Sequence, residues 1–567
     1  MKKMIYMIVV AAVTMLLAGC SDFLDVQPEG SPTTTTYFAN DAQAINAIKA
    51  LYAPIYDSDG GYGREIYWEQ CATNMMVPGR TRSYPVLFTL NYSGDEGPLS
   101  DTYNLFMGII ARANWVVKAL LDKQAKTTLT PIEIRSLGEA YFVRGFLHFS
   151  LAYRYGSNRQ GIPAIKYEEV EGEYDYSIPP QQATVMDNYA MIIADFEKAK
   201  EYLPRFETYG PDDRGRAHQA AAVAMMSRVY AYWATWDNTK WDNVISVVNE
   251  LENSYGRRLA DSFSNLFSAD FKYWWGPEYC FTFPSNGGND WKRGGVEWPG
   301  VILENKGWGV FNGWGQFKPT QDAYEEFAKD GEENNERLTR SILKYGQEFQ
   351  FWGETRRFFS ESDVETGFQI NKWMDPFGYP DAINAGYVNY SGDWPTARVN
   401  FTVIRFADCM LLRAEANLAK GNNSEAAKDL NKIRARVNLP ENCVGTWEEL
   451  YHERFCELAY EPVADHLGDL KRWAVSSYPE IKALAIKELE THPRARHYSG
   501  YVTDPNTGES RFMDGYRGDP DGPYTIGAYL DFQSPAPKWE DHKICFPYPS
   551  NEITKAAGAL KQNYGYN

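Results

Sequence analysis

Apolar residues recur every three to four positions along most of the chain, which is the spacing of one face of an α-helix. In the N-terminal half this pattern predicts helices at residues 41–52, 105–121, 131–156, 185–203, 216–236 and 241–254. It returns further along the chain at residues 401–420, 424–437, 447–460 and 464–473. Short turns between consecutive helices favour antiparallel pairs, whose length is close to that of a tetratricopeptide repeat. The pattern therefore predicts a mainly α fold with a tetratricopeptide-like helical scaffold.

Two stretches interrupt the helical pattern. Residues 257–400 are rich in glycine, tryptophan, phenylalanine and asparagine, and only 321–329 and 336–343 have helical spacing. Residues 491–543 are rich in glycine, aspartate, proline and tyrosine. A long loop inside a compact domain usually carries function. We predict one domain at 41–567, and its parts are a helical scaffold (41–256 and 401–490), a loop-rich binding insertion (257–400) and an irregular C-terminal part (491–567).

The first twenty residues have the three parts of a lipoprotein signal peptide. Lys2 and Lys3 supply positive charge, residues 5–17 are mostly apolar, and Leu17-Ala18-Gly19-Cys20 places small residues before a cysteine. The secretory machinery reads this pattern, and the apolar run is shorter than the ~20 residues that cross a bilayer. We predict a signal peptide at 1–19, lipidation of Cys20, and a lipid anchor with a polar tether at 20–40. An ordinary signal peptide with an incidental cysteine is the alternative.

Composition narrows the classes of partner. The formal net charge is -18 and the isoelectric point is near 5.0. This argues against nucleic acid, because nucleic-acid binding needs a basic surface. Aromatic residues make up 15% of the chain, with 17 Trp and 39 Tyr. These two side chains combine a flat apolar face with a polar tip, which suits a protein that binds flat, half-polar molecules.

One group of carboxylates could be mistaken for catalytic residues. Glu453, Glu457 and Glu461 lie four residues apart on one face of a predicted helix, as a carboxylate pair for glycoside hydrolysis could. A simpler interpretation is that ion pairs tie this helix to its neighbours. The basic residues expected to form these pairs are Arg454, Lys471 and Arg472.

Motifs for metals and cofactors lack their required spacing. His452 begins a zincin-like string, but Cys456 stands where the second histidine must be. The six cysteines after Cys20 contain no C-x-x-C pair, and Cys409 and Cys456 are expected to be small buried hydrophobes. Disulfides remain open. Residues 504–509 alternate oxygen ligands as a Ca²⁺ loop does, but a solvated turn is favoured because the remaining ligands are missing. We predict no cofactor and no metal.

Several motifs, in the same order along nearly the whole chain, resemble those of the SusD/RagB family. The most specific are RFADCMLLRAEA at 405–416, the helix 427–436, ER..ELA at 453–459, DLKRW at 469–473, and FPYP..EI…QNYGY at 546–566. Residues 140–156 and Gly315 with Pro319-Thr320 match upstream. Asp408 departs from the usual glutamate, and Leu467-Gly468 replaces an aromatic residue often found before DLKRW.

The resemblance implies a surface-exposed lipoprotein of the cell outer membrane, held by its lipid anchor. Family members act as a hinged lid over a SusC-type TonB-dependent transporter. They capture an oligosaccharide or polysaccharide ligand and deliver it without doing chemistry on it, so the resemblance implies that the protein is not an enzyme. Two alternatives stay open. One is capture of peptides or another nutrient by the same lid, and the other is a surface glycoside hydrolase.

A glycan site needs aromatic faces for the apolar side of sugar rings and polar groups for their hydroxyls. The family's site usually draws on a loop after the first helix and on the central insertion. The ligand-binding residues expected here are Trp68, Asn74, Arg80, Trp274, Trp275, Asn289, Trp291, Trp298 and Trp308. The alternative is that each tryptophan fills a small core beneath a loop, and this alternative is strongest for Trp314.

Overall fold

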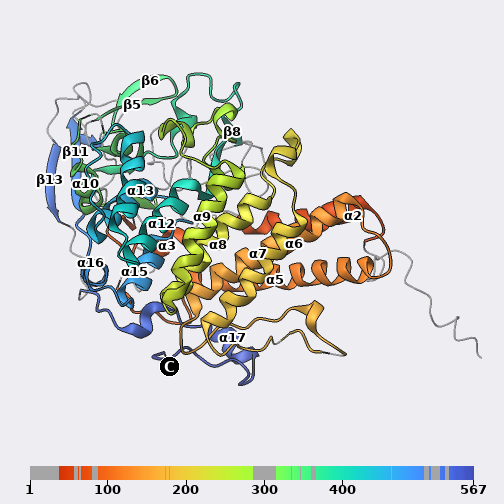
Figure 1. Ribbon diagram of the computed structural model, residues 1–567. Coiled ribbons are helices and arrows are strands. Elements are labelled where there is room, and N and C mark those ends of the chain that lie inside the picture. The colour runs from red at the N-terminus through yellow and green to blue at the C-terminus, as the bar shows by residue number, and fades with distance from the viewer. Residues whose placement is uncertain are drawn as a thin grey trace, which may run out of the picture.

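The computed structural model of the protein describes residues 38–56, 62, 65–78, 87, 89–172, 174–177, 179–284, 315–333, 335–344, 347–358, 366–391, 394–461, 463–503, 510–512, 524–529 and 536–566. Successive helices of the N-terminal half pack side by side in the order of the chain (Figure 1). Their bounds are α2 (Asp41–Tyr52), α3 (Glu65–Gln70), α5 (Gly97–Gln124), α6 (Pro131–Tyr155), α7 (Val185–Tyr202), α8 (Gln219–Ala234) and α9 (Trp241–Tyr255). This architecture confirms the predicted mainly α fold class.

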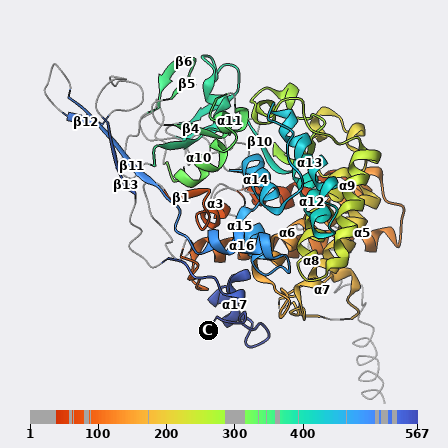
Figure 2. The same ribbon diagram turned by 60° about the vertical axis from the view of Figure 1, so that its left-hand side comes forward.

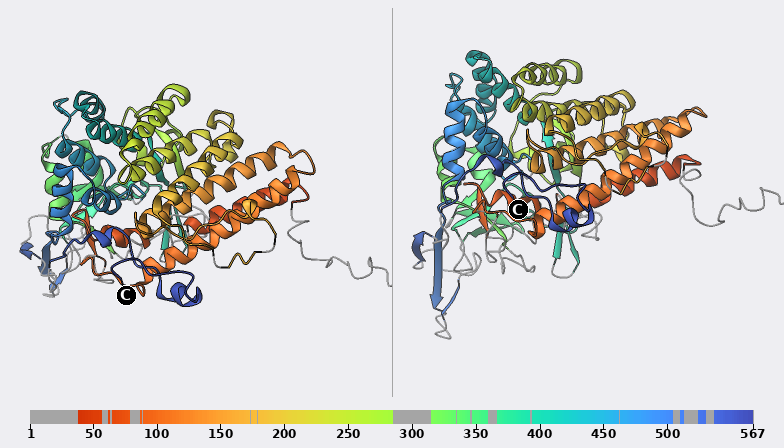
Figure 3. Two further views of the ribbon diagram at one scale, coloured as in Figure 1. Left: turned by 60° about the horizontal axis from the view of Figure 1, so that its bottom comes forward. Right: turned by 90° about the horizontal axis from the view of Figure 1, so that it is seen from below.

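A second helical segment continues the same stack. The helices are α12 (Phe406–Ala419), α13 (Asn423–Arg436), α14 (Trp447–Leu458), α15 (His466–Ala474) and α16 (Pro479–Leu489). A short helix near the C-terminus, α17 (Ser550–Lys555), lies apart from them (Figure 1). α12 packs on α8 and α9, and α13 packs on α12, so segments far apart in the sequence share one layer. Figure 3 shows this layering from below. The described part of the chain thus continues the stack from α9 into α12 and α13.

Local sequence signals fix the bounds of the central helix α6. The Thr130 hydroxyl accepts a hydrogen bond from the Glu133 N–H, and the Glu133 carboxylate accepts one from the Thr130 N–H. This capping box satisfies donors that the first turn of a helix leaves free. The helix ends before Gly156, where a Cβ would lie 2.7 Å from the Ala152 carbonyl oxygen. α6 is buried along nearly its whole length because it packs against α2, α5 and α7.

The predicted helix at 401–420 is wrong in its first part. Asn400–Arg405 forms strand β10, which pairs antiparallel with β2 (Tyr279–Pro284), and α12 begins only at Phe406. The strand contains Phe401, Thr402, Val403 and Ile404, and β-branched and aromatic residues favour a strand when a partner is available. That partner lies far away in the sequence, so helical spacing alone could not reveal it.

Short antiparallel strand pairs build the region expected to be loop-rich. They gather on one side of the helical stack (Figure 2). The pairs are β1 (Met76–Pro78) with β3 (Phe317–Pro319), β4 (Ile342–Lys344) with β7 (Phe368–Ile370), β5 (Glu348–Phe351) with β6 (Glu354–Arg357), and β8 (Val388–Ser391) with β9 (Trp394–Ala397). Helices α10 (Gln321–Ala328) and α11 (Glu336–Ser341) lie between them in sequence, and β11 (Arg496–Thr503), β12 (Ser510–Phe512) and β13 (Tyr524–Tyr529) form a sheet near the C-terminus.

The structure tests the prediction for the buried cysteines but not the predictions for the N-terminal segment and the 504–509 loop. Cys409 and Cys456 are fully buried, as predicted, and the six cysteines after Cys20 are free thiols. By length and composition α5 is the one described helix that could span a membrane, but its apolar face packs against α6. The signal peptide, Cys20, the tether as far as residue 37 and the 504–509 loop lie outside the described residues.

Candidate functional site

The strand pair β1–β3 connects the two segments in which ligand-binding residues are predicted. In its antiparallel register Met76 lies opposite Pro319 and Pro78 lies opposite Phe317. The chain therefore leaves β1 towards residue 80 at the same end at which it enters β3 from residue 314. Five predicted site residues lie on these connections, outside the described residues: Arg80, Asn289, Trp291, Trp298 and Trp308. Trp314, predicted to be a core residue, also lies there.

Two predicted site residues lie at the base of this strand pair. Trp68 on α3 is only 3% exposed, and its ring meets that of Phe317 edge-on at 4.9 Å. Trp68 therefore packs against β3 and does not offer its ring face to a ligand in this structure. The half-buried Asn74 uses its backbone, because its N–H donates to Glu488 Oε1 at 2.7 Å and its carbonyl oxygen accepts the Thr320 hydroxyl.

Thr320, the residue after β3, makes two hydrogen bonds through its side chain. Its hydroxyl oxygen accepts a hydrogen bond from the Ala323 N–H at 2.9 Å, which caps the N-terminus of α10. The same hydroxyl donates to the Asn74 carbonyl, so one side chain joins α10 to the segment before β1. The Asn74 Oδ1 atom is buried and has no hydrogen-bond partner among the described residues.

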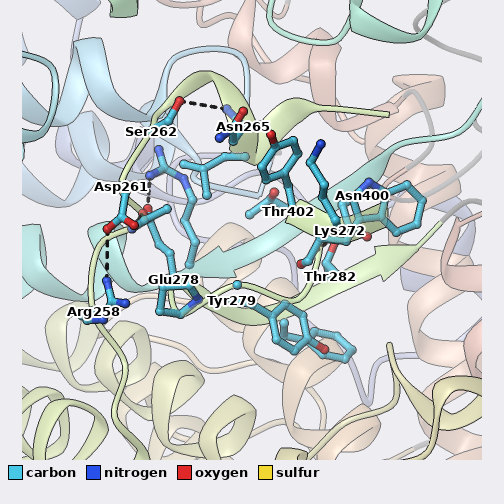
Figure 4. A pocket seen from close by; sticks show the side chains of 18 of the residues that line it. Arg258, Asp261, Ser262, Asn265, Lys272, Glu278, Tyr279, Thr282, Asn400 and Thr402 are labelled. Carbon is cyan, nitrogen blue, oxygen red and sulfur yellow. Dashed lines mark hydrogen bonds and ion pairs between the residues drawn. The ribbon is translucent and has the colours of Figure 1, made fainter. Parts of the chain in front are cut away.

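Trp274 and Trp275 come shortly before β2 in the sequence, and Trp274 lines a pocket of about 230 Å³. Figure 4 shows this pocket with Glu278, Asn400 and Thr402 in its lining. Trp274 is 4% exposed, and its Nε1 donates to the Ser268 carbonyl oxygen at 2.8 Å. Trp275 is half-buried and packs edge-on against Tyr279 at 5.1 Å. Of the predicted tryptophans that are described, Trp275 is the most accessible.

The pocket beside Trp274 combines apolar walls with polar groups that the sequence did not single out. Asn400 donates through Nδ2 to the Trp274 carbonyl oxygen at 3.0 Å, while its Oδ1 is buried without a partner in the described structure. Glu278 forms one wall and is neutralised by Arg405 at 2.6 Å and Arg436 at 3.0 Å. Such a lining can accept hydrogen bonds from hydroxyl or amide donors.

The carboxylates on α14 and just after it are locked in ion pairs. Glu453 lies 2.6 Å from both Arg337 and Arg434. Glu457 lies 2.5 Å from Arg405 and also pairs with Arg436. Burial by itself would raise the pKa of Glu457, but the charges of Arg436, Arg405 and Arg337 outweigh it and hold this pKa well below its usual range. A general acid needs the opposite shift and access to substrate.

The predicted ion pairs therefore exist, but their partners differ from those expected. Glu461 is held by Arg405 at 2.8 Å and Lys372 at 2.9 Å. Arg454 instead binds Asp469 at 2.6 Å, and Arg472 binds Glu415 at 2.5 Å. Lys471 has its Nζ atom 3.6 Å from the centre of the Phe546 ring. The partners come from β10, α11 and α13, which local helical spacing could not predict.

A histidine–cysteine–carboxylate cluster lies between α10 and α14. Asp330, His452 and Cys456 bring potential ligand atoms within 4.8 Å of one another. Both ring nitrogens of His452 are engaged, Nδ1 by Glu326 at 2.7 Å and Nε2 by Asp330 at 3.0 Å. Although burial lowers the pKa of His452, the charge and hydrogen bond of Cys456 and the hydrogen bonds of Asp330 and Glu326 raise it to about 12. An imidazolium has no free lone pair for a metal, and we assign no metal to this cluster.

Comparisons with known proteins match both halves of the chain. Residues 277–566, more than half of the chain, match the family model described as "SusD family". Residues 22–231 match a model described as "Starch-binding associating with outer membrane". A "SusD-like protein" from Bacteroides ovatus is 23% identical over 477 residues, which is 80% of each chain. "SusD-like protein P25" from Formosa agariphila is 21% identical over 496 residues, which is 80% of this chain and 87% of that one.

Solved structures share the fold at low identity. A SusD-like protein from Bacteroides fragilis superposes with a TM-score of 0.69 at 20% identity, over 94% of this chain and 98% of that one. Surface glycan-binding protein A from Bacteroides uniformis gives a TM-score of 0.65 at 19% identity, over 92% and 99% of the two chains. A structure solved with a xylogluco-oligosaccharide gives 0.66 at 18% identity, over 92% and 100%.

Proposed function

This chain belongs to the SusD family, and on that premise we propose that it is a cell-surface lipoprotein that captures oligosaccharides and delivers them to a SusC-type TonB-dependent transporter. The family is associated with the outer membrane and with glycan binding, and the protein is not an enzyme. The observation that carries the proposal is the register of β1 with β3, which brings the ends of both predicted binding segments to one place.

In this proposal the sugar-binding groups belong to the two segments of the sequence that follow β1 and precede β3. Trp291, Trp298 and Trp308 would stack on the apolar faces of sugar rings, and Arg80 and Asn289 would bind hydroxyl groups. Each aromatic platform would contribute about 1–3 kcal/mol from apolar area removed from water. Trp68 would stabilise β3 and not contact the sugar, because its ring packs against Phe317.

The half-buried Trp275 and the pocket lined by its neighbour Trp274 extend the proposed binding region. Asn400 Oδ1 is a buried acceptor without a partner in the described structure, and it lines this pocket with Thr402 and Lys272. A sugar hydroxyl can satisfy such an acceptor, and buried polar groups are normally satisfied. Neutral oligosaccharides fit best, because the pocket's Glu278 is already paired with Arg405 and Arg436.

The test is titration of the purified protein, without residues 1–20, against a panel of neutral polysaccharides and their oligosaccharides. Release of reducing sugar is measured in parallel. We expect binding without release. Release of sugar that disappears in Glu457→Gln would overturn the proposal in favour of a glycoside hydrolase, and saturable binding of peptides but not glycans would favour peptide capture.

Variants locate the proposed site. Trp291→Ala and Trp308→Ala should each weaken glycan binding about tenfold or more, as loss of an aromatic anchor does at other interfaces. Trp233→Ala is the control, because the half-buried Trp233 is on α8 of the helical stack and not in the insertion. There the Lys240 Nζ atom lies 4.3 Å from the centre of its ring. Equal affinities for the three variants would show that the tryptophans of the insertion do not form the site.

Anchoring and delivery form the remaining part of the proposal. Two or three acyl chains on Cys20 would hold the domain stably at a membrane, whereas one chain does so only marginally. Cys20→Ser should move the full-length protein from the membrane fraction to the soluble fraction. A transporter of the SusC type from the same genome should co-purify with the wild-type protein, and retention of the Cys20→Ser protein in the membrane would contradict lipidation at this residue.

A further inference from the structure

A larger cavity lies on another part of the molecule, where α5 and α6 meet the C-terminal helix α17. Its volume is about 410 Å³, against about 230 Å³ for the pocket beside Trp274. This volume falls within the range of small-ligand sites. Residues after α6, between 163 and 167 and at 176, 177 and 179, line it, and α17 lies beside α5 (Figure 3). Residues that matter for its chemistry are Tyr103, Asn114, His148, Tyr167, Tyr176 and Lys555.

His148 on α6 is an unsatisfied polar group in the wall of this cavity. It is only 3% exposed, and its Nε2 atom has no hydrogen-bond partner among the described residues. Burial, and then the charges of Arg144 and Lys166, lower the pKa of His148 to about 3. The ring is therefore neutral at physiological pH, with one N–H donor and one acceptor. A hydroxyl group can donate or accept, so it can satisfy Nε2 whichever tautomer is present.

An aromatic rim adjoins the cavity. Tyr167 and Tyr176 line it, with ring centres 3.9 Å apart. Trp115 meets these rings edge-on at 5.0 and 5.3 Å, and Tyr174 lies 5.3 Å from Tyr176. Trp115 and Tyr174 are each 41% exposed, among the few large apolar side chains in the described structure that face solvent so fully. Four connected rings thus lead from the surface to the cavity.

The charges around the cavity are already paired. Lys555 binds Glu552 at 2.6 Å on α17. Behind the wall, Arg144 is neutralised by Asp195 and Glu168, both at 2.7 Å. An ionic ligand would find no unpaired partner in these groups, so a neutral ligand is favoured. Apolar faces next to a neutral hydrogen-bonding group match the two-sided chemistry of a sugar ring.

We propose that this cavity and its rim form a second saccharide-binding site, in which a neutral sugar unit bonds to His148 through a hydroxyl and the next unit stacks on Trp115 and Tyr174. That the ligand is a saccharide rests on the proposed function, whereas the location of the site rests only on the cavity and its aromatic rim. Two sites on one chain would hold a long glycan more tightly than a short one, because the second contact becomes intramolecular.

The test follows the imidazole of His148 directly. Protein labelled with ¹⁵N-histidine is titrated with maltohexaose, cellohexaose, xylohexaose and a xyloglucan heptasaccharide, and the ring resonances are recorded. His148→Phe assigns the resonance. We expect one of these saccharides to shift the His148 signals in the wild type and in Trp291→Ala, and the shift to require at least about tenfold more saccharide in Trp115→Ala/Tyr174→Ala.

The outcomes separate this proposal from the main one. Trp115 and Tyr174 are exposed, so their double variant should fold, and its circular dichroism and Tm are checked against the wild type. Loss of binding in Trp291→Ala together with unchanged His148 shifts supports two independent sites. If no saccharide shifts His148 while the insertion still binds glycan, the second site is overturned and the main one stands. If Trp115→Ala breaks a dimer seen by sedimentation, the face is an interface between copies and the proposal also fails.

Discussion

The helical stack and the strand-rich insertion are stabilised in different ways. In the stack, neighbours in space are mostly neighbours in sequence, as α5, α6, α7, α8 and α9 pack in order. In the insertion, the hairpins β5–β6 and β8–β9 are local, but β3 pairs with β1 and β2 pairs with β10, which are far away in the sequence. Local contacts of the first kind can be predicted from periodicity, whereas pairings of the second kind depend on the whole fold.

Arg405 shows how the two regions are joined. It is the last residue of β10, and its guanidinium binds Glu457 at 2.5 Å, Glu278 at 2.6 Å and Glu461 at 2.8 Å. It is 3% exposed. One buried cation at the end of β10 thus joins Glu278 of the insertion to carboxylates on and just after α14. The most informative tests change this junction or compare matched positions in the two regions.

The largest effect is expected from Arg405→Met. It leaves three buried carboxylates without their shared cation, and breaking a buried ion pair from one side costs about 3–5 kcal/mol. Urea unfolding followed by tryptophan fluorescence measures the loss. Lys428→Met is the control, because Lys428 and its partner Glu425 are 64% and 53% exposed and exposed pairs contribute little. Equal stabilities of the two variants would show that Arg405 does not hold the regions together.

A pair of tryptophans tests whether the two regions unfold together. Trp373 in the insertion and Trp473 in the stack are 0% and 1% exposed. Both donate through Nε1, to the Tyr460 carbonyl at 2.9 Å and to Glu415 at 2.7 Å. Replacing either with alanine should cost about 3 kcal/mol or more by leaving a cavity. If the regions share one core, both variants shift the same single unfolding transition, whereas two transitions in Trp373→Ala would show a separately unfolding insertion.

The sequence predicts the helical stack better than it predicts the strand pairs. α6 was located to within one residue, because Thr130, Glu133 and Gly156 encode its bounds locally. α7 was located to within one residue from its apolar spacing, and the structure shows that Thr184 and Asp187 form a second capping box at its start. The strand 400–405 was missed, because its partner is remote in sequence. For the ion pairs of α14, the presence of partners was predictable, but which arginines supply them depends on packing.

The candidate sites were harder to predict than the helices. Trp68 and Trp274 were selected for their residue type and neighbouring loops, and both are buried. Periodicity does not distinguish a tryptophan that covers a small core from one that faces a ligand. Trp115 was missed although a signal exists: within the predicted helix 105–121 it lies off the apolar stripe of Ile109, Ala113, Val116 and Leu120. A large aromatic residue on the polar face of an amphipathic helix is a reason to look for a ligand.

A smaller, pH-dependent effect is expected at His452, which also bridges the insertion and the stack. Its pKa in the folded protein is raised to about 12, and an unfolded histidine titrates near 6.5. Its stabilisation is therefore complete below about pH 6.5 and is lost as the pH rises towards 12. Between pH 7.5 and 9.5 this one group should lower the unfolding free energy by about 1.4 kcal/mol per pH unit. His452→Gln should remove that slope, and parallel pH profiles of the two proteins would contradict the assignment.

The smallest effects compare two helix caps, one on each side of the junction. Thr130 caps α6 in the stack, and Thr130→Ala should cost about 1 kcal/mol, the usual loss for an N-cap. Thr320 caps α10 in the insertion and also donates to the Asn74 carbonyl, so Thr320→Ala removes two bonds and leaves that carbonyl unpaired. It should therefore cost more in urea unfolding than Thr130→Ala, and it should weaken glycan binding because it loosens β1 relative to β3. Equal losses of stability with unchanged binding would mean that the β1–β3 pair is held without Thr320.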